Sequence, residues 1–293
     1  MNRALHFMNR SRRITLALVL LFAASGATSA QESKEEKRPL LDVQGNKIFS
    51  KQELLSVVNS QLDEWAGHGT KYNTQQLDYC MHQMDFLMKS RGYLQSRSTK
   101  KDVEETEAGP RQVLTVIEGP LFRVGDASVE GARLFPSQVV LETLGLRTGD
   151  IANGKLISEG LFQRLKTRYG KLGYIQYTAE IVPFFHIKDG AGEGVVDFKI
   201  TIDEGDQFRI RSIKIAGVDA RLTDALARES LLRAGDIYDD ELFHESITRM
   251  SRTGLVDPIE PERDVEFTEN QSKPLVDLVI HVKKPGKLSA GER

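Results

Sequence analysis

Few side chains in this sequence of 293 residues could do covalent or metal chemistry. The single cysteine, Cys80, lies two positions from His82. Residues at that spacing on a helix face different directions, so the two cannot form a nucleophile and its base. We therefore expect Cys80 in a hydrophobic core. Metal-ligand spacing is absent among the later histidines, which are His68, His82, His186, His244 and His281.

Two short motifs resemble signatures of phosphate-binding or catalytic sites. The segment from Gly190 to Gly194 is glycine-rich, but it lies between two predicted strands and opens no helix, so we expect a hairpin turn. Ser98 and Lys101 have the spacing of a Ser-x-x-Lys motif, yet they fall in a polar strand without the partner motifs of such enzymes. The sequence therefore predicts no enzyme, no catalytic residue, no cofactor and no metal site.

Residues 1–30 have the pattern of a signal peptide. Four arginines precede an apolar run over residues 14–24. The run is too short for a membrane span of roughly 20 residues, and small residues follow it up to Ala30. We expect cleavage after Ala30, and an uncleaved N-terminal anchor is the alternative. Of the 40 Lys and Arg, four would leave with this segment. The remaining 36 face 42 Asp and Glu, which argues against a nucleic-acid partner.

A repeat organises the rest of the chain. One glycine ends a short apolar segment in each unit, and a second follows the basic residues at a predicted helix end, where a left-handed glycine can stop the helix. The first set, spaced by 86 residues, is Gly45, Gly131 and Gly217; the second set, spaced by 81 residues, is Gly92, Gly173 and Gly254. Two longer segments also match at an offset of 86 residues, namely 116–124 with 202–210 and 146–151 with 232–237.

Each unit has the pattern strand, helix, helix, strand, strand. Ser50 and Glu53 have the spacing of a capping box that opens the first helix, and the next helix should start near Asn73. Apolar residues at helical spacing define the faces that we expect in the cores. They are Leu54, Leu55, Val58 and Leu62; Leu77, Cys80, Met81, Met84, Leu87 and Met88; Ile157, Leu161, Leu165 and Leu172; and Phe243, Ile247 and Met250.

The last two strands of each unit are predicted to form a hairpin, with turns over residues 102–110, 189–194 and 269–274. Two antiparallel helices return the chain to the start of the first strand, so the third strand can pair beside the first. The second strand then lies outside the third as an open edge, and its unpaired N–H and C=O groups can bind another extended chain.

These units resemble POTRA domains, the polypeptide-transport-associated domains of the BamA-type outer-membrane protein insertase family. The matching features are the order of elements, the helix-Gly-Tyr junctions at 92–93 and 173–174, and the Glu-Gly-x-x-Phe-Arg links at 118–123 and 204–209. The resemblance implies an α+β fold of three tandem β-α-α-β-β domains, each a three-stranded mixed sheet covered by two helices. The predicted boundaries are a signal peptide (1–30), a charged linker (31–39), three domains (40–119, 120–205 and 206–287) and a tail (288–293).

The resemblance also implies a function. It indicates a periplasmic polypeptide-binding module, associated with the outer membrane, that acts in outer-membrane protein assembly by β-augmentation. Its partners would be unfolded outer-membrane proteins, a separate β-barrel or an accessory subunit. Family members continue into a barrel, whereas here Lys284-Pro285 replaces the Glu-Gly link and six residues follow Lys287. We therefore expect an arm that acts with a separate barrel. A scaffold subunit of another envelope machine, in two-partner secretion or cell division, is the alternative.

The second strand of the middle unit is the candidate partner-binding edge, because it is the most apolar of the three. Residues 175, 177, 179 and 181 alternate with polar ones, which predicts one buried and one wet face. A strand that is only better packed is the alternative, and a proline at 178 or 180 is expected to abolish binding while leaving the fold intact. The predicted edge residues are Tyr174, Gln176, Thr178, Glu180 and Val182.

Overall fold

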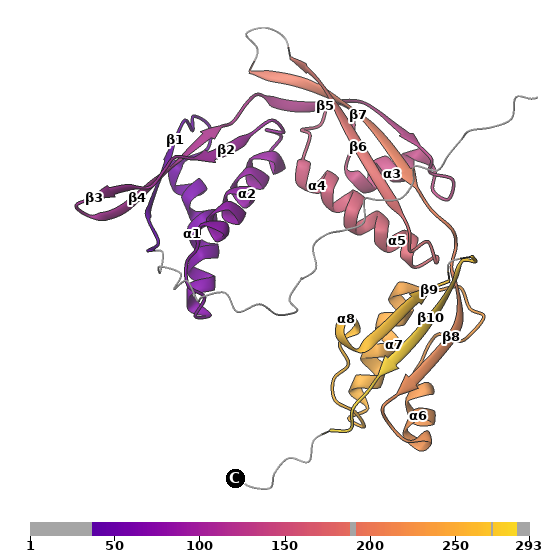
Figure 1. Cartoon of the computed structure of the whole chain (residues 1–293). Coiled ribbons are helices and arrows are strands. Elements are labelled where there is room, and N and C mark those ends of the chain that lie inside the picture. The colour runs from indigo at the N-terminus through magenta and orange to yellow at the C-terminus, as the bar shows by residue number, and fades with distance from the viewer. Residues whose placement is uncertain (1–36, 188–191, 271, 286–293) are drawn as a thin grey trace, which may run out of the picture. The chain divides into compact units, whose positions relative to one another are not determined.

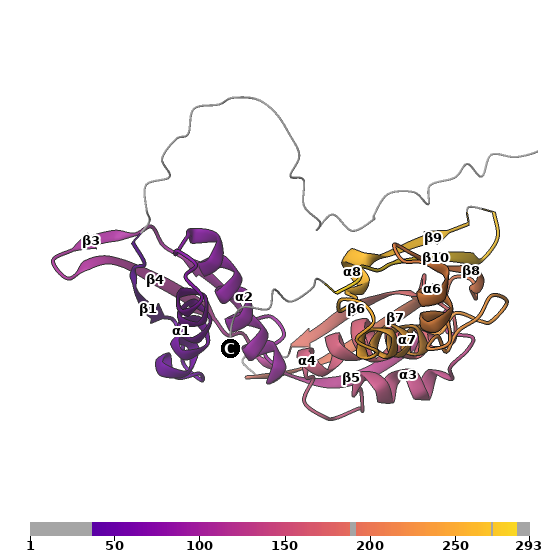
Figure 2. The same ribbon diagram turned by 90° about the horizontal axis from the view of Figure 1, so that it is seen from below.

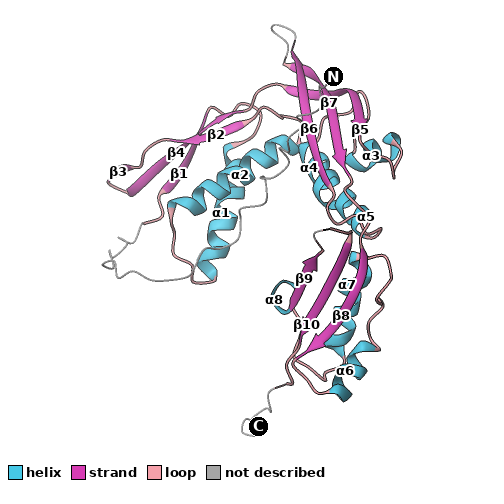
Figure 3. Ribbon diagram, turned by 45° about the vertical axis from the view of Figure 1, so that its right-hand side comes forward, coloured by secondary structure: helices cyan, strands magenta, loops and turns pink. Residues whose placement is uncertain are grey.

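Three mixed β-sheets, each with helices against one face, make up the described part of the chain (Figures 1 and 3). The structure is a computed structural model, and it describes residues 37–187, 192–270 and 272–285. It confirms the predicted α+β class with three tandem sheet units. The predicted signal peptide, most of the charged linker, the tail at 288–293 and part of the turn at 190–194 lie outside the described residues.

In the first unit, β4 is the central strand, with β1 parallel on one side and β2 antiparallel on the other. Its helices begin at the predicted caps. The Ser50 hydroxyl accepts the Glu53 N–H at 3.1 Å, and Asn73 and Gln76 form a full capping box. The main elements are β1 (Leu40–Gln44), α1 (Lys51–Gly67), α2 (Thr74–Ser90), β2 (Arg97–Lys100) and β4 (Gly109–Ile117).

The predicted turn at 102–110 is wrong. It contains a further strand, β3 (Glu104–Thr106), which pairs antiparallel with the start of β4 and extends this hairpin beyond the other strands of the unit (Figure 2). Gly109 closes the turn with a φ of 110°, and the Thr106 hydroxyl donates to the Gly109 carbonyl at 2.7 Å. The acidic run of this segment suits a fully exposed ribbon as well as a loop, so its composition did not separate the two.

In the second unit, β7 is the central strand, with β5 parallel and β6 antiparallel to it. The predicted helical stripe is confirmed for Ile157, Leu161 and Leu165, which are buried. Leu172 is an exception, because it lies beyond the last helix and is 40% exposed, while Tyr169 is fully buried. The elements are β5 (Leu121–Glu130), α3 (Ser137–Leu144), α4 (Gly154–Glu159), the π-helix η1 (Gly160–Leu165), α5 (Lys166–Gly170), β6 (Thr178–Ile187) and β7 (Glu193–Asp203).

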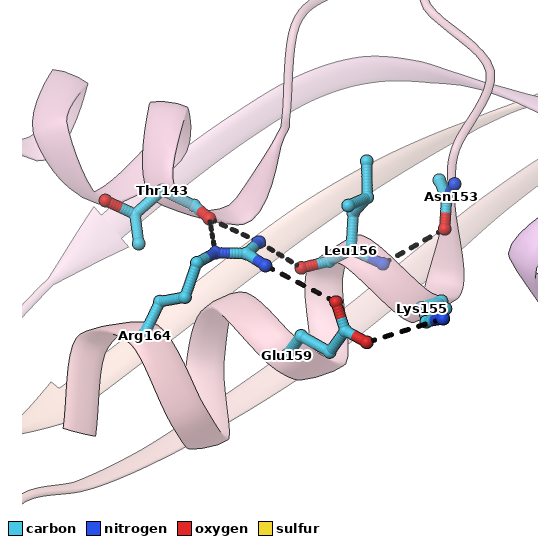
Figure 4. A network of polar contacts seen from close by, with 6 residues as sticks. All are labelled: Thr143, Asn153, Lys155, Leu156, Glu159 and Arg164. Carbon is cyan, nitrogen blue, oxygen red and sulfur yellow. Dashed lines mark hydrogen bonds and ion pairs between the residues drawn. The ribbon is translucent and has the colours of Figure 1, made fainter. Parts of the chain in front are cut away.

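The π-helical turn η1 places Arg164 against the end of α3 (Figure 4). One guanidinium nitrogen donates to the Thr143 carbonyl at 2.7 Å and to the Leu156 carbonyl at 2.8 Å, and another lies 3.5 Å from a Glu159 carboxylate oxygen. The last carbonyls of a helix have no partner within it, so Arg164 satisfies the end of α3. Gly160 permits the close approach, because a Cβ there would lie 2.7 Å from the Thr143 carbonyl oxygen.

In the third unit, β10 is the central strand, with β8 parallel and β9 antiparallel to it. Phe243, Ile247 and Met250 are buried, as predicted. The elements are β8 (Arg209–Ala216), α6 (Ala220–Ala227), α7 (Asp240–Arg252), the short helix α8 (Pro261–Asp264), β9 (Val265–Glu269) and β10 (Leu275–His281).

Each unit has its own hydrophobic core, and one side chain crosses at each junction into the core of the following unit. Leu94, after α2, packs against the core of the second unit, and Ile175, after α5, packs against that of the third. The alternating pattern had predicted Ile175 on the buried face of β6. That prediction is wrong for Ile175, which packs against the third core instead. The same junctions share a hydrogen bond: the Gly92 carbonyl accepts the Phe122 N–H at 2.9 Å, and the Gly173 carbonyl accepts the Phe208 N–H at 2.8 Å.

Over residues 37–187, 192–270 and 272–285, no helix has both the length and the hydropathy needed to cross a membrane.

Candidate functional site

The candidate site is the outer side of β6. In all three sheets the last strand of the unit is central and the strand before it lies outside, as predicted. Of these three outer strands, β6 has ten residues, whereas β2 has four and β9 has five. Within the described residues, no backbone hydrogen bond from another segment reaches the outer side of β6. An open strand of this length is the longest template for strand addition that these hairpins provide.

The hydrogen bonds of β7 decide which backbone groups of β6 are free. The Gly192 carbonyl accepts the Leu121 N–H of β5 at 3.1 Å, and the Ile202 carbonyl lies against Gly131 at the end of β5. The N–H and C=O groups of the even-numbered residues of β7 therefore point toward β5, and those of the odd-numbered residues point toward β6. This follows because the backbone groups of successive strand residues point to opposite sides. Thr178 lies opposite Asp203, so the even-numbered residues of β6 bond to β7 and the odd-numbered ones face outward.

The five predicted edge residues do not carry the open backbone groups. Tyr174 and Gln176 precede β6, which begins at Thr178, so they are not part of the edge strand. Thr178, Glu180 and Val182 lie on β6 and expose their side chains on the sheet face that the helices leave uncovered, but their N–H and C=O groups face β7. A proline at position 178 or 180 would remove a hydrogen bond of the ladder, so the register favours a destabilised fold over the intact fold expected from the sequence.

The free groups belong to the odd-numbered residues of β6. Ala179, Ile181, Phe185 and Ile187 each direct an N–H and a C=O outward, and Pro183 directs only a C=O. The sequence held a signal for this assignment, because a proline within a sheet is confined to positions where the ladder does not need its N–H. The position of Pro183 alone indicates that the odd-numbered residues face the open side.

Apolar side chains lie beside this edge on the uncovered face of the sheet. Val182, Phe184 and Val195 are exposed by 37%, 51% and 43% of their surfaces. Opposite Phe184, the Asp197 carboxylate accepts the Asp126 N–H at 2.7 Å and lies 2.7 Å from the His186 Nε2. The Asp126 N–H and the His186 imidazole lower the pKa of Asp197, so this face carries a carboxylate next to an apolar strip.

The other edge strands of the second and third sheets, β5 and β8, are protected by the segments that repeat at 146–151 and 232–237. On β5, Val124 donates to the Asp150 carbonyl at 2.8 Å and accepts the Gly149 N–H at 2.7 Å. On β8, Ile210 makes the same two bonds with the equivalent loop, at 2.9 and 2.7 Å. The repeated motif therefore covers one edge of the second and third sheets, which leaves the outer side of β6 as the long open edge of the second unit.

Glu204 is a buried carboxylate at the end of β7, 3% exposed, and it illustrates a structural use of charge. Its oxygens accept the N–H groups of Arg133 and Leu134, both at 2.8 Å, and the Tyr169 hydroxyl at 3.0 Å. Burial alone would raise the pKa of Glu204, but these hydrogen bonds hold that pKa below its ordinary value. Burial and the neighbouring Glu204 carboxylate raise the pKa of Tyr169. Glu204 therefore anchors the loop after β5.

The first unit has the same kind of loop anchor, a glutamate. In the third unit a lysine takes the place of the glutamate. Glu118 accepts the N–H groups of Ile48 and Phe49 at 3.0 and 2.9 Å. In the third unit Lys284 takes the corresponding place after the central strand and donates to Asp219, the N-cap residue of α6, at 2.8 Å. The substitution of Lys284-Pro285 for the Glu-Gly link is thus part of a different loop anchor.

A groove of about 640 Å³ lies between α3 and the helices that follow it. Its basic residues already have partners within the unit: Arg164 caps α3, and Arg168 donates to the Thr143 hydroxyl at 3.0 Å and lies over the Phe135 ring. No group of three or more metal-ligating side chains occurs in residues 37–187, 192–270 and 272–285, and Cys80 is fully buried in the first core.

A family model for POTRA domains, described as a surface antigen variable number repeat, matches residues 122–205 and 208–284, more than half of the chain. The chain belongs to the POTRA family. A protein of Treponema pallidum (strain Nichols), named for a role as an outer membrane protein assembly factor, is 26% identical over 261 residues, 87% of this chain and 30% of that protein. Outer membrane protein assembly factor BamA of Neisseria meningitidis serogroup B is 23% identical over 235 residues, 78% of this chain and 29% of the relative.

A solved structure supports the fold of this POTRA protein. The crystal structure of Haemophilus influenzae BamA POTRA3-5 has a TM-score of 0.61 at 20% identity, and the similarity covers 84% of this chain and 95% of that one. The POTRA chain spans about 30% of the length of the two relatives above. The resemblance to BamA-type POTRA arms that the repeat motifs indicated is confirmed.

Proposed function

We propose that this POTRA protein acts in the periplasm in the assembly of outer-membrane proteins, as a module that binds extended polypeptide segments along β6. The observation that carries the proposal is the row of open backbone groups on the odd-numbered residues of this strand. Backbone hydrogen bonds to an edge strand recognise extended chains of many sequences, which suits clients that arrive unfolded. The segment bound would come from an unfolded outer-membrane protein, a β-barrel or an accessory subunit.

Two further observations support this function. The relatives described above are named as outer membrane protein assembly factors. Residues 1–30 have the composition of a cleaved export signal. Mass spectrometry of the protein purified from the cell envelope should give a mature chain that begins at Gln31. An N-terminus at Met1 in the cytoplasmic fraction would contradict the proposed location.

The binding site can be tested with a photocrosslinking amino acid at position 180, whose side chain is exposed while its backbone stays in the ladder. Ala179→Pro removes one outward N–H from the edge, and Ala179→Val keeps that N–H as a matched control. We expect Ala179→Val to crosslink envelope proteins as the parent does and Ala179→Pro to lose about tenfold in yield. Circular dichroism checks that both variants are folded.

Undiminished crosslinking by a folded Ala179→Pro variant would contradict binding through the β6 edge. The identity of the crosslinked proteins tests the pathway. Outer-membrane barrel proteins or their assembly partners support the proposal, whereas components of a secretion or division system would replace it by a scaffold role there.

A further inference from the structure

We infer that Pro183 divides the open edge of β6 into two short pairing segments and thereby limits how long a strand this protein can bind. The identity of the bound ligand in this inference rests on the proposed function. The effect of Pro183 on pairing between two copies of the protein does not rest on that function. The inferred occupant of this edge is a short extended segment that pairs beside residues 178–182.

The register places the missing N–H of Pro183 on the open side. Pro183 lies opposite Phe198, an even-numbered residue of β7 whose backbone groups face β5. The ladder between β6 and β7 is therefore intact through all ten residue pairs, and the cost of the proline falls only on a strand that would be added outside. A partner residue opposite Pro183 would leave its own carbonyl without a donor when water is excluded, which is unfavourable.

The two segments on either side of Pro183 offer different numbers of bonding groups. On the N-terminal side, Ala179 and Ile181 each provide an N–H and a C=O, and Pro183 adds its C=O. On the C-terminal side, Phe185 and Ile187 provide the same kinds of group, but β6 ends at Ile187. The N-terminal segment is therefore the better template, and a partner strand of about five residues fills it, which is an ordinary strand length.

The exposed side chains indicate the chemistry of the bound segment. Val182 lies on the uncovered face two positions from Phe184, so an apolar side chain of the partner would pack there. Glu180 lies next to this strip on the same face and favours a basic side chain on the neighbouring position of the partner. The inferred ligand is a short strand with an apolar residue and a basic residue on one face.

The same proline opposes pairing between two copies of the protein. Two open β6 strands with exposed apolar side chains are a template for edge-to-edge association, and proline on an edge is one of the devices that natural sheets use against it. Restoring the N–H at position 183 should therefore have two effects, a longer bound segment and a greater tendency to dimerise.

The experiment compares Pro183→Ala with Pro136→Ala, the same change at the N-cap of α3, away from the β6 edge. The probes are synthetic valine-threonine peptides with terminal lysines, one matching the ten residues of β6 and one of about five residues. For the parent protein we expect affinities for the two peptides within about threefold. Pro183→Ala should bind the longer peptide about tenfold more tightly, bind the shorter one as before and shift toward dimer in sedimentation velocity, and Pro136→Ala should change none of these.

The outcomes separate the inference from the proposed function. If Pro183→Ala changes neither the ratio of the two affinities nor the sedimentation, Pro183 does not limit pairing and the inference is wrong, even where the parent protein binds both peptides. If no variant binds a peptide but Pro183→Ala dimerises, the inference about the edge holds and the proposed function fails.

Discussion

A single position at the end of the central strand shows how side-chain chemistry adapts to a repeated loop. Glu118 and Glu204 present carboxylates to backbone N–H groups, whereas Lys284 presents an ammonium group to the Asp219 carboxylate. The buried glutamates have no competing solvent, so their hydrogen bonds are worth more than those of the exposed lysine pair, which is more than half exposed on both sides. The loops are alike in position, but their dependence on charge differs.

Replacing Glu204 by glutamine should lower the free energy of unfolding of the second unit by about 1–3 kcal/mol at neutral pH, because a buried charge-assisted acceptor is lost. The folded pKa of Glu204 is below its unfolded value, so its stabilisation is present above about pH 4.5 and is lost as the pH falls through the folded pKa. Urea denaturation as a function of pH measures both effects. Glu130→Gln is the control, since Glu130 is exposed and should change stability by less than about 1 kcal/mol. An equal loss in both variants at all pH values would contradict a special role for Glu204.

At the scale of elements, β6 shows that exposure of a side chain and availability of its backbone are different properties. The side chains of Thr178 and Glu180 are exposed, yet their backbone groups are used by β7. The side chains of Ala179 and Ile181 pack against the core of the second unit, yet their backbone groups are open. A site for strand addition must be assigned from the hydrogen-bond register and not from exposure.

The register makes a direct prediction for adjacent prolines. Glu180→Pro should destabilise the second unit by about 1–3 kcal/mol, because it leaves a β7 carbonyl without its donor inside the sheet. Ala179→Pro should cost less than about 1 kcal/mol, since its N–H faces outward. The difference between the two urea denaturation midpoints checks this. Equal costs, or the reverse order, would show that the assignment of open and paired residues is wrong.

The glycines after the helices provide a second test at this scale. Gly173 has a φ of 83°, and a Cβ there would lie 2.9 Å from the Phe208 carbonyl oxygen at the junction with the third unit. Gly254 has a φ of 66° with no heavy atom within 4 Å of its Cβ position. Gly254→Ala should cost about 1–2 kcal/mol for backbone conformation alone, and Gly173→Ala should cost more because it also displaces the junction. Thermal denaturation of both variants decides whether the junction contact adds to the conformational cost.

At the scale of the whole molecule, the chain is a series of separate cores joined by short links. Leu94 and Ile175 are the side chains that extend from one unit into the next core. We propose the domain boundaries 40–119, 120–205 and 206–287, with the qualification that Ile175 completes the third core from outside these limits. The units should therefore fold separately but stabilise one another at the junctions.

Two fragments test this organisation. A fragment of residues 206–287 should unfold cooperatively, and a fragment of residues 172–287, which includes Ile175, should be more stable by about 1–2 kcal/mol. Ile175→Ala in the longer fragment should remove most of that difference. Urea denaturation followed by circular dichroism measures all three. A longer fragment with no added stability would indicate that Ile175 contributes nothing to the third core.

The sequence alone determined the features that depend on local spacing. The offsets of 81 and 86 residues established the repeat. The caps at Ser50 and Asn73 marked the helices, and the helical periodicity identified most of the core, because these signals act within a few residues.

Tertiary structure decided the rest, because a strand's pairing partner cannot be read from its own residues. The ladder between β6 and β7 fixed the open groups on the odd-numbered residues, in agreement with the position of Pro183 in the sequence. Only the packing between units showed that Ile175 belongs to the next core and that Leu172 belongs to none. Alternation along a strand predicts two faces, but which backbone groups stay open depends on the register with β7, and β7 in turn pairs with β5 about 70 residues away along the chain.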